Sequence, residues 1–348
     1  MMKELIRNIR NYAIISNKEV IYIDRTFRII SFPEKKCLGT IENAYDIYYF
    51  ENNIIIVEDY YGKAFIIDAG KVKPFLQKKY SISQIWKNYA IVYWDSEGSI
   101  GYFGVFNIKN NNLLYEKEDI MRRKILSCKE LVCYSKTELF YINYIANISI
   151  WQFSISGFPS YIQGQEADIK QIIGVYNNVL WIHVGEFHLI GLDVDNGKIV
   201  HHIEDIRTII KSANNNIELG FSLKLEFFLD KEKGLLKALL GNSYIEIDLN
   251  TLSGIEKKYF GNDWKNGWHV HSTNFYPEEP SHIFFSGYYQ LNAGKPNAFG
   301  IFDTEKAEII WYDTTKDDLG YFYNPPQAND KLLAILDDKK NLLIYERD

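Results

Sequence analysis

The stretch that decides the fold reads Val179-Leu180-Trp181-Ile182-His183-Val184, then His188-Leu189-Ile190-Gly191-Leu192-Asp193, Asp195-Asn196-Gly197 and Lys198-Ile199-Val200-His201-His202-Ile203. Largely apolar runs separated by short polar turns are typical of β-strands. The Asn196-Gly197 step supplies the positive φ angles that a tight turn between strands requires. We therefore expect two strands around a turn, the polar residue Asp193 at the end of the second, and then an outer strand.

The same pattern, an apolar run that ends in Asp or Asn before a polar turn, recurs along the chain. We call this terminal polar residue the marker. The markers are Asp24, Asp68, Asn107, Asn143, Asp193, Asp248 and Asp303, with Glu346 in the last position, and successive markers are 44, 39, 36, 50, 55, 55 and 43 residues apart. We expect the Asp or Asn side chain to fold onto the backbone of the turn that follows it. Repeats of this length built from strands rather than helices indicate a β-propeller.

We predict an all-β fold, a single β-propeller of four-stranded antiparallel blades that spans residues 1–348 as one domain. The markers define eight units, but no strand follows Glu346 in the last one. The segment from Lys3 to Arg10 can supply that strand, so that N-terminal and C-terminal strands together close the ring. Eight blades fit the number of units, whereas seven is the commoner solution. We expect seven blades, with eight as the alternative.

The local pattern resembles the quinoprotein-like and WD40-like propeller repeats, in which a strand ending in Asp precedes a Gly-bearing turn and an outer strand. The resemblance covers nearly the whole chain and implies the fold. The Gly-His and Trp-Asp pairs of WD40 repeats are missing. The quinoprotein signature is also missing, and Asp303 followed by Trp311 matches it only loosely. Since the resemblance carries over no cofactor-binding residue, we predict no cofactor.

Composition and charge exclude several classes of protein. A formal net charge of −6 argues against general nucleic-acid binding, which needs a clustered basic face, and suits a basic partner. Three cysteines are too few for a disulfide scaffold. The N-terminal residues lack the apolar segment of a signal peptide, and the sequence contains no apolar span long enough for a membrane helix. We expect a cytoplasmic protein that contacts neither membrane nor nucleic acid.

Function is expected in loops, because strands fill the blades of a propeller. The longer units of the second half carry extra residues at 203–219, 260–271, 287–297 and 312–329. Three of these segments join an outer strand to the next blade, the other joins two middle strands, and both kinds of loop emerge on the same face. We expect one aromatic binding patch there, made of Trp264, Trp268, His269, His271, Tyr288, Tyr289, Tyr321 and Tyr323. Trp and Tyr anchor protein interfaces; the alternative is that these rings fill gaps between wide blades.

Metal and catalytic signatures are weak. His269 and His271 share one side of a strand, and Glu278 or Glu279 could add a carboxylate, but a structural zinc site needs about four ligands. We therefore predict no metal site. The sequence also lacks a nucleophile elbow, a phosphate-binding glycine loop and a zinc-protease motif. We predict no catalytic residue.

Three functions remain open. The first is a non-enzymatic protein-binding propeller, in a more specific version a bacterial immunity protein that neutralises a secreted toxin; Asn, Ile and Lys usage suggests an AT-rich bacterial genome. The second is a propeller enzyme, a hydrolase, lactonase or lyase acting on a sugar derivative in the central channel. The innermost strands look apolar or aromatic, which favours a filled channel instead. The third is a scaffold of an intracellular complex.

Overall fold

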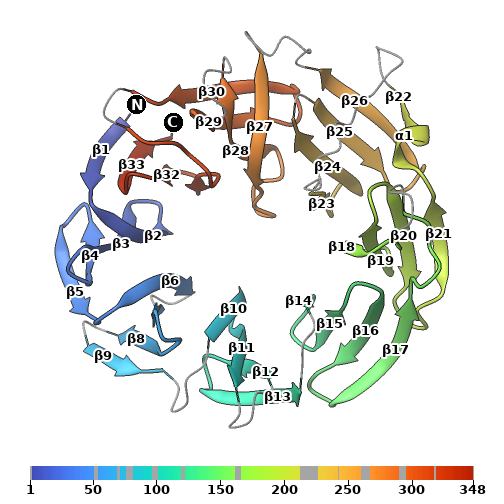
Figure 1. Ribbon diagram of the computed structural model, residues 1–348, viewed down its shortest axis with the longest axis horizontal. Coiled ribbons are helices and arrows are strands. Elements are labelled where there is room, and N and C mark those ends of the chain that lie inside the picture. The colour runs from blue at the N-terminus through green and yellow to red at the C-terminus, as the bar shows by residue number, and fades with distance from the viewer. Residues whose placement is uncertain are drawn as a thin grey trace.

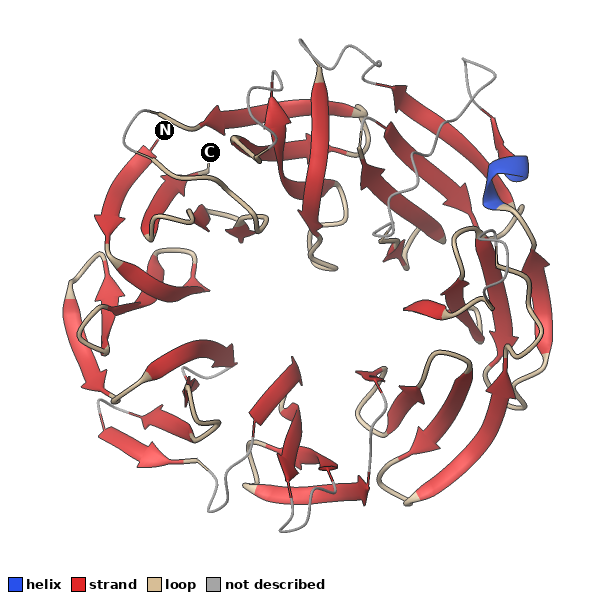
Figure 2. Cartoon of the chain, viewed as in Figure 1, coloured by secondary structure: helices blue, strands red, loops and turns tan. Residues whose placement is uncertain are grey.

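Short apolar runs form strands throughout the computed structural model, which describes residues 2–50, 54–68, 71–75, 81–95, 101–118, 122–160, 166–211, 226–241, 243–259, 267–289, 295–316 and 319–347. The described residues form eight sheets (Figure 2). Figure 1 shows the sheets side by side in a ring, each running outward from the centre. This arrangement is a β-propeller, as predicted.

Each blade is an antiparallel sheet whose strands run from the innermost to the outermost. The first four blades consist of β2 (Ile9–Ser16), β3 (Glu19–Asp24), β4 (Arg28–Phe32) and β5 (Lys36–Thr40); β6 (Ala44–Phe50), β7 (Ile54–Asp59), β8 (Ala64–Asp68) and β9 (Lys71–Pro74); β10 (Ser81–Trp86), β11 (Tyr89–Asp95), β12 (Gly101–Asn107) and β13 (Asn112–Glu118); and β14 (Arg122–Ile125), β15 (Glu130–Tyr134), β16 (Glu138–Asn143) and β17 (Ile148–Ser154).

The next three blades follow the same order. They consist of β18 (Ile169–Tyr176), β19 (Val179–Val184), β20 (His188–Asp193) and β21 (Ile199–Ile203); β23 (Phe228–Asp230), β24 (Leu235–Leu240), β25 (Ser243–Asp248) and β26 (Ser253–Tyr259); and β27 (Trp268–Asn274), β28 (His282–Tyr289), β29 (Ala298–Asp303) and β30 (Glu308–Thr314). A helical turn, α1 (Ile206–Ile209), leads into β22 (Ile210–Lys211), which adds a parallel edge strand to β26. No helix in the described part of the chain is long and apolar enough to cross a membrane.

The eighth blade is made from both ends of the chain. It contains β31 (Gln327–Ala328), β32 (Leu332–Leu336), β33 (Asn341–Glu346) and, as its outer strand, β1 (Met2–Arg7). β1 pairs antiparallel with β33, with Leu5 opposite Leu343, and the two termini lie side by side in Figure 1. The predicted closure is therefore confirmed. Because β1 completes the last unit, the described residues form eight blades, the alternative of the sequence analysis, rather than seven.

The hydrophobic core lies between the blades. The described apolar residues group into eight clusters, one at each junction between neighbouring sheets. Middle strands such as β19 and β20 are buried on both sides, which explains their continuous apolar runs. The outer strand β30 alternates exposed and partly buried positions over its first five residues, since one of its faces meets solvent.

The marker turn is confirmed wherever the structure describes its hydrogen bonds. Asp193 Oδ1 accepts hydrogen bonds from the backbone N–H groups of Asp195 and Asn196, at 3.0 and 3.1 Å. Equivalent bonds are made by Asn107, Asn143, Asp248 and Asp303. Asp24 makes the same kind of bond but ends β3, a second strand, whereas the other markers end third strands. The first blade therefore carries its Asp turn one hairpin earlier than the series predicts.

Candidate functional site

Loops of two kinds emerge on one face of the ring. Because each blade runs from an inner to an outer strand with alternating direction, the loops between second and third strands share a face with the connections between blades. We call this the upper face. The four long segments named in the sequence analysis are of these two kinds. The described part of the first ends in β22 at the outer edge of blade six, and the described loop residues of the other three lie on the upper face. Trp264 lies outside the described residues.

Trp268 lies in a cluster of aromatic rings at the beginning of β27. Its ring centroid is 4.8 Å from that of Tyr289, its cross-strand partner on β28, and 5.0 Å from that of Tyr312 on β30. It also meets Phe285 edge to face at 5.5 Å, and Phe285 is fully buried in the core between blades six and seven. Trp268 thus packs partly against the core, as the gap-filling alternative expects, while Tyr312 is 45% exposed.

His269, His271, Tyr288 and Tyr323 form a second group, which we call the histidine cluster. The Tyr288 ring lies edge-on to both imidazoles, at 5.7 Å from His269 and 6.0 Å from His271. Tyr323, from the segment before β31, approaches His271 at 6.3 Å. The backbone of that segment is tied to β27 by a hydrogen bond from Ser272 Oγ to the Tyr323 carbonyl. Burial and the neighbouring His271 both lower the pKa of His269, so a neutral imidazole is favoured there.

Tyr321 stands apart from both groups. The Lys295 ammonium lies 4.9 Å from the centre of its ring. Its backbone N–H donates to Asp338 Oδ1, and its carbonyl accepts from the Asp338 N–H. The segment before β31 is therefore fixed to the β32–β33 loop at Tyr321 and to β27 at Tyr323. The structure brings six of the eight predicted patch residues into two adjoining groups.

The carboxylates considered as partners for the histidine pair lie at the other end of the hairpin. Glu278 and Glu279 follow β27, whereas His269 is near its start. Glu279 accepts a hydrogen bond from His282 Nδ1 at 2.6 Å and is paired with Arg347. Burial opposes ionisation of Glu279, but these bonds outweigh it and lower the pKa to about 2. Among the described residues, no group of three His, Cys, Asp or Glu side chains is arranged to hold a metal ion.

A cavity of about 360 Å³ adjoins the histidine cluster. It is lined by Glu226, Leu239, Val270, His271, Ser272, Thr273 and Pro325. The strand β23 has three residues and pairs only with Leu235 to Lys237 of β24. Further along, the Val270 N–H of β27 donates directly to the Gly241 carbonyl at 2.6 Å. Sequence reasoning missed this cavity, because its walls come from β24, β27 and the segment before β31, which lie far apart in the sequence.

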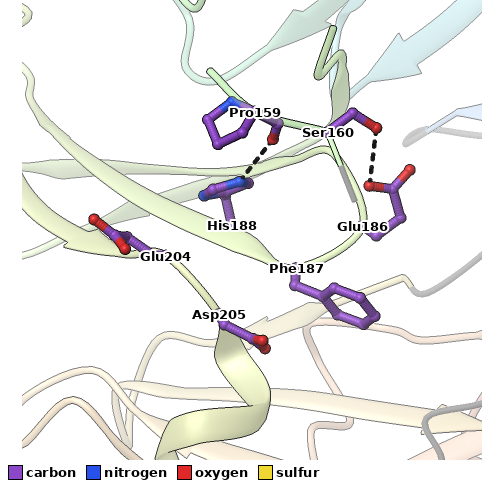
Figure 3. A pocket seen from close by; sticks show the side chains of 7 residues that line it. All are labelled: Pro159, Ser160, Glu186, Phe187, His188, Glu204 and Asp205. Carbon is purple, nitrogen blue, oxygen red and sulfur yellow. Dashed lines mark hydrogen bonds between the residues drawn. The ribbon is translucent and has the colours of Figure 1, made fainter. Parts of the chain in front are cut away.

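A smaller cavity, of about 230 Å³, opens at blade five (Figure 3). It is lined by Pro159, Ser160, Glu186, Phe187, His188, Glu204 and Asp205. Since a carbonyl only accepts, His188 Nε2 donates to Pro159 O at 3.0 Å, and its Nδ1 is left to accept from His202 Nε2 at 3.4 Å. Asp205 is bound by the Arg207 guanidinium, which also covers the Phe187 ring. The polar groups of this cavity largely satisfy one another.

The innermost strands use polar side chains to join neighbouring blades. Asn11 Nδ2 donates to Asp46 Oδ1, and Lys124 Nζ donates to the Ile172 and Ile173 carbonyls. The Gln171 amide forms two hydrogen bonds with the backbone of Phe227. The innermost strands, expected to be apolar or aromatic, therefore also carry polar side chains that form hydrogen bonds between blades. A polar residue on an inner strand is not by itself a sign of a catalytic channel in this ring.

Comparisons with known proteins establish the fold and no closer relationship. No protein-family model and no curated protein sequence matches the chain. Among solved structures, BamB from Moraxella catarrhalis is similar over 100% of this chain and 99% of its own, with a TM-score of 0.58 and 13% sequence identity. Saccharomyces cerevisiae Sqt1 is similar over 98% of this chain and 96% of its own, with a TM-score of 0.62 and 11% identity. Identities this low show a shared propeller fold alone.

Proposed function

We propose that this chain is a non-enzymatic, cytoplasmic propeller that binds a protein partner on its upper face at blades seven and eight. The observation that carries the proposal is the histidine cluster beside a cavity of about 360 Å³. Aromatic side chains bury a large area at low entropic cost. The cavity has apolar walls at Leu239, Val270 and Pro325, which suit an anchoring apolar side chain of a partner.

The inner strands support a binding function over a catalytic one. Asn11, Lys124 and Gln171 are engaged in ties between blades, and each therefore has a structural role. A more specific version of the proposal is an immunity protein that neutralises a secreted bacterial toxin. It is motivated by the net charge of −6, which suits a basic partner.

The test is affinity capture from the native host with two surface variants. His271→Ala/Tyr288→Ala/Tyr323→Ala removes the rings of the histidine cluster, and Thr273→Trp fills the cavity. Trp268 is left intact, because it packs on the core. We expect both variants to lose a stoichiometric protein partner that wild type retains. Ile310→Ala, on an exposed position of the outer strand β30, is the matched control and should retain it.

Two results would count against the proposal. One is a partner that both variants bind as tightly as wild type, which would place the binding surface elsewhere. The other is the lack of any stoichiometric partner for wild type, which would favour a small-molecule site in the ring. If a partner is found, the amino-acid sequence of that partner decides whether it is a toxin.

A further inference from the structure

A separate aromatic group lies on the upper face at blade two. Tyr45 begins the inner strand β6, and Tyr60 and Tyr61 form the turn between β7 and β8. The three residues are 56%, 74% and 63% exposed. Tyr60 meets Tyr45 edge to face at 5.9 Å and Tyr61 at 6.0 Å. We call these residues the tyrosine triad; blades eight and one separate it from the histidine cluster (Figure 1).

The backbone beneath the triad is held firmly. The Tyr60 N–H donates to the Asn43 carbonyl at 2.9 Å, and the Tyr61 N–H donates to Asp59 Oδ1 at 2.9 Å. The Tyr45 carbonyl accepts from Asn11 Nδ2 at 3.2 Å. The rings are therefore presented from fixed positions rather than from a loose loop. Since more than half of the surface of each residue faces solvent, core packing does not explain three adjacent aromatic residues here.

The surroundings of the triad are acidic. Glu42 is exposed in the loop whose Asn43 carbonyl receives the Tyr60 N–H, whereas Asp46, which follows Tyr45, is partly buried and accepts from Asn11 Nδ2. Lys63, the exposed cation of the same turn, is outnumbered by these carboxylates. The faces of tyrosine rings attract cations, and nearby carboxylates add to this attraction. Arg10 shows the same chemistry within this chain, since its guanidinium carbon lies 4.2 Å from the centre of the Phe27 ring.

We propose that the tyrosine triad binds arginine or lysine side chains of a protein partner, with Glu42, the exposed carboxylate of the adjoining loop, completing the charge complementarity. That this partner is the one held at the histidine cluster rests on the proposed function. Both groups lie on the upper face, so one protein that spans blades seven to two can contact both. The triad's preference for cationic side chains can be tested separately.

The test uses a fluorescein-labelled hexapeptide of alternating glycine and arginine, with binding followed by fluorescence anisotropy. The control peptide carries citrulline, which keeps the shape of arginine but not its charge. We expect wild type to bind the arginine peptide and Tyr45→Ala/Tyr60→Ala/Tyr61→Ala to bind it about fivefold or more weakly. The corresponding triple Phe variant keeps the rings and should bind within about twofold of wild type. Ile145→Ala, at an exposed apolar position on the opposite face, should bind like wild type.

The inference is overturned if wild type does not bind the arginine peptide, if citrulline binds equally well, or if the triple Ala variant binds like wild type. Thermal unfolding of the triple Ala variant checks that it folds. The histidine-cluster variant separates this inference from the proposed function. It should bind the peptide normally, so its loss of the protein partner tests the proposed function alone.

Discussion

At the scale of single residues, the hydrogen bonds of the marker side chain explain why both Asp and Asn occur in the series. Asp193 and Asn143 both use Oδ1 as the acceptor for N–H groups two or three residues further on. The turn needs an oxygen on a short side chain, and its charge is secondary. The residue four positions after each of these markers has a positive φ, with values of 69° at Gly197 and 55° at Asn147.

Removal of that oxygen at one marker should destabilise the whole protein modestly. We expect Asp193→Ala to lower the free energy of unfolding by about 1 kcal/mol, because two N–H groups lose their acceptor. Asp193→Asn keeps Oδ1 and should lie within about 0.5 kcal/mol of wild type. Urea unfolding, followed by tryptophan fluorescence, measures both changes. An Asn variant as unstable as the Ala variant would mean that the charge, rather than the acceptor, matters.

At the scale of elements, ion pairs fasten the blades where the sheets meet. Glu279, in the turn between β27 and β28 of blade seven, is bound by Arg347, which follows β33 of blade eight. Lys237 of blade six is buried and donates to Asp230 at 2.8 Å and to the Pro280 carbonyl of blade seven at 2.8 Å. These bonds complement the apolar clusters between the same blades.

The pair at Glu279 should make stability depend on pH. The pKa of Glu279 is lowered from 4.5 to about 2 in the folded protein. Its contribution is therefore complete above the unfolded pKa and is lost as the pH falls from about 4.5 towards 2. At about 1.4 kcal/mol per pKa unit, the loss is at most roughly 3.5 kcal/mol. Urea unfolding of wild type and Glu279→Gln between pH 7 and 2.5 measures it. The stability difference between the two proteins should shrink as the pH falls; a constant difference would contradict this assignment.

At the scale of the whole molecule, the local sequence pattern predicted the blades. The candidate sites instead depend on contacts between neighbouring strands and blades. The strands at 179–184 and 188–193 are found as predicted, because a middle strand and its turn are specified by neighbouring residues. Tyr323 meets His271 only because the ring places the start of blade eight beside blade seven. The triad also escaped prediction. Tyr45 lies beside Tyr60 because β6 pairs with β7. The sequence analysis looked for binding residues only in the longer units, and this unit has an ordinary length.

Closure by β1 gives the last prediction, because the ring depends on a contact between its two ends. Without residues 1–7, β33 loses its outer partner, and the apolar clusters of blade eight lose Leu5 and Ile6. We expect a chain that begins at Asn8 to unfold roughly 10 °C below wild type, since several kcal/mol of pairing and burial are removed. A synthetic peptide of residues 1–7 should restore part of the loss when added in excess. Differential scanning calorimetry measures both effects. If the shortened chain keeps the melting temperature of the full chain, the packing between blades holds the ring without β1.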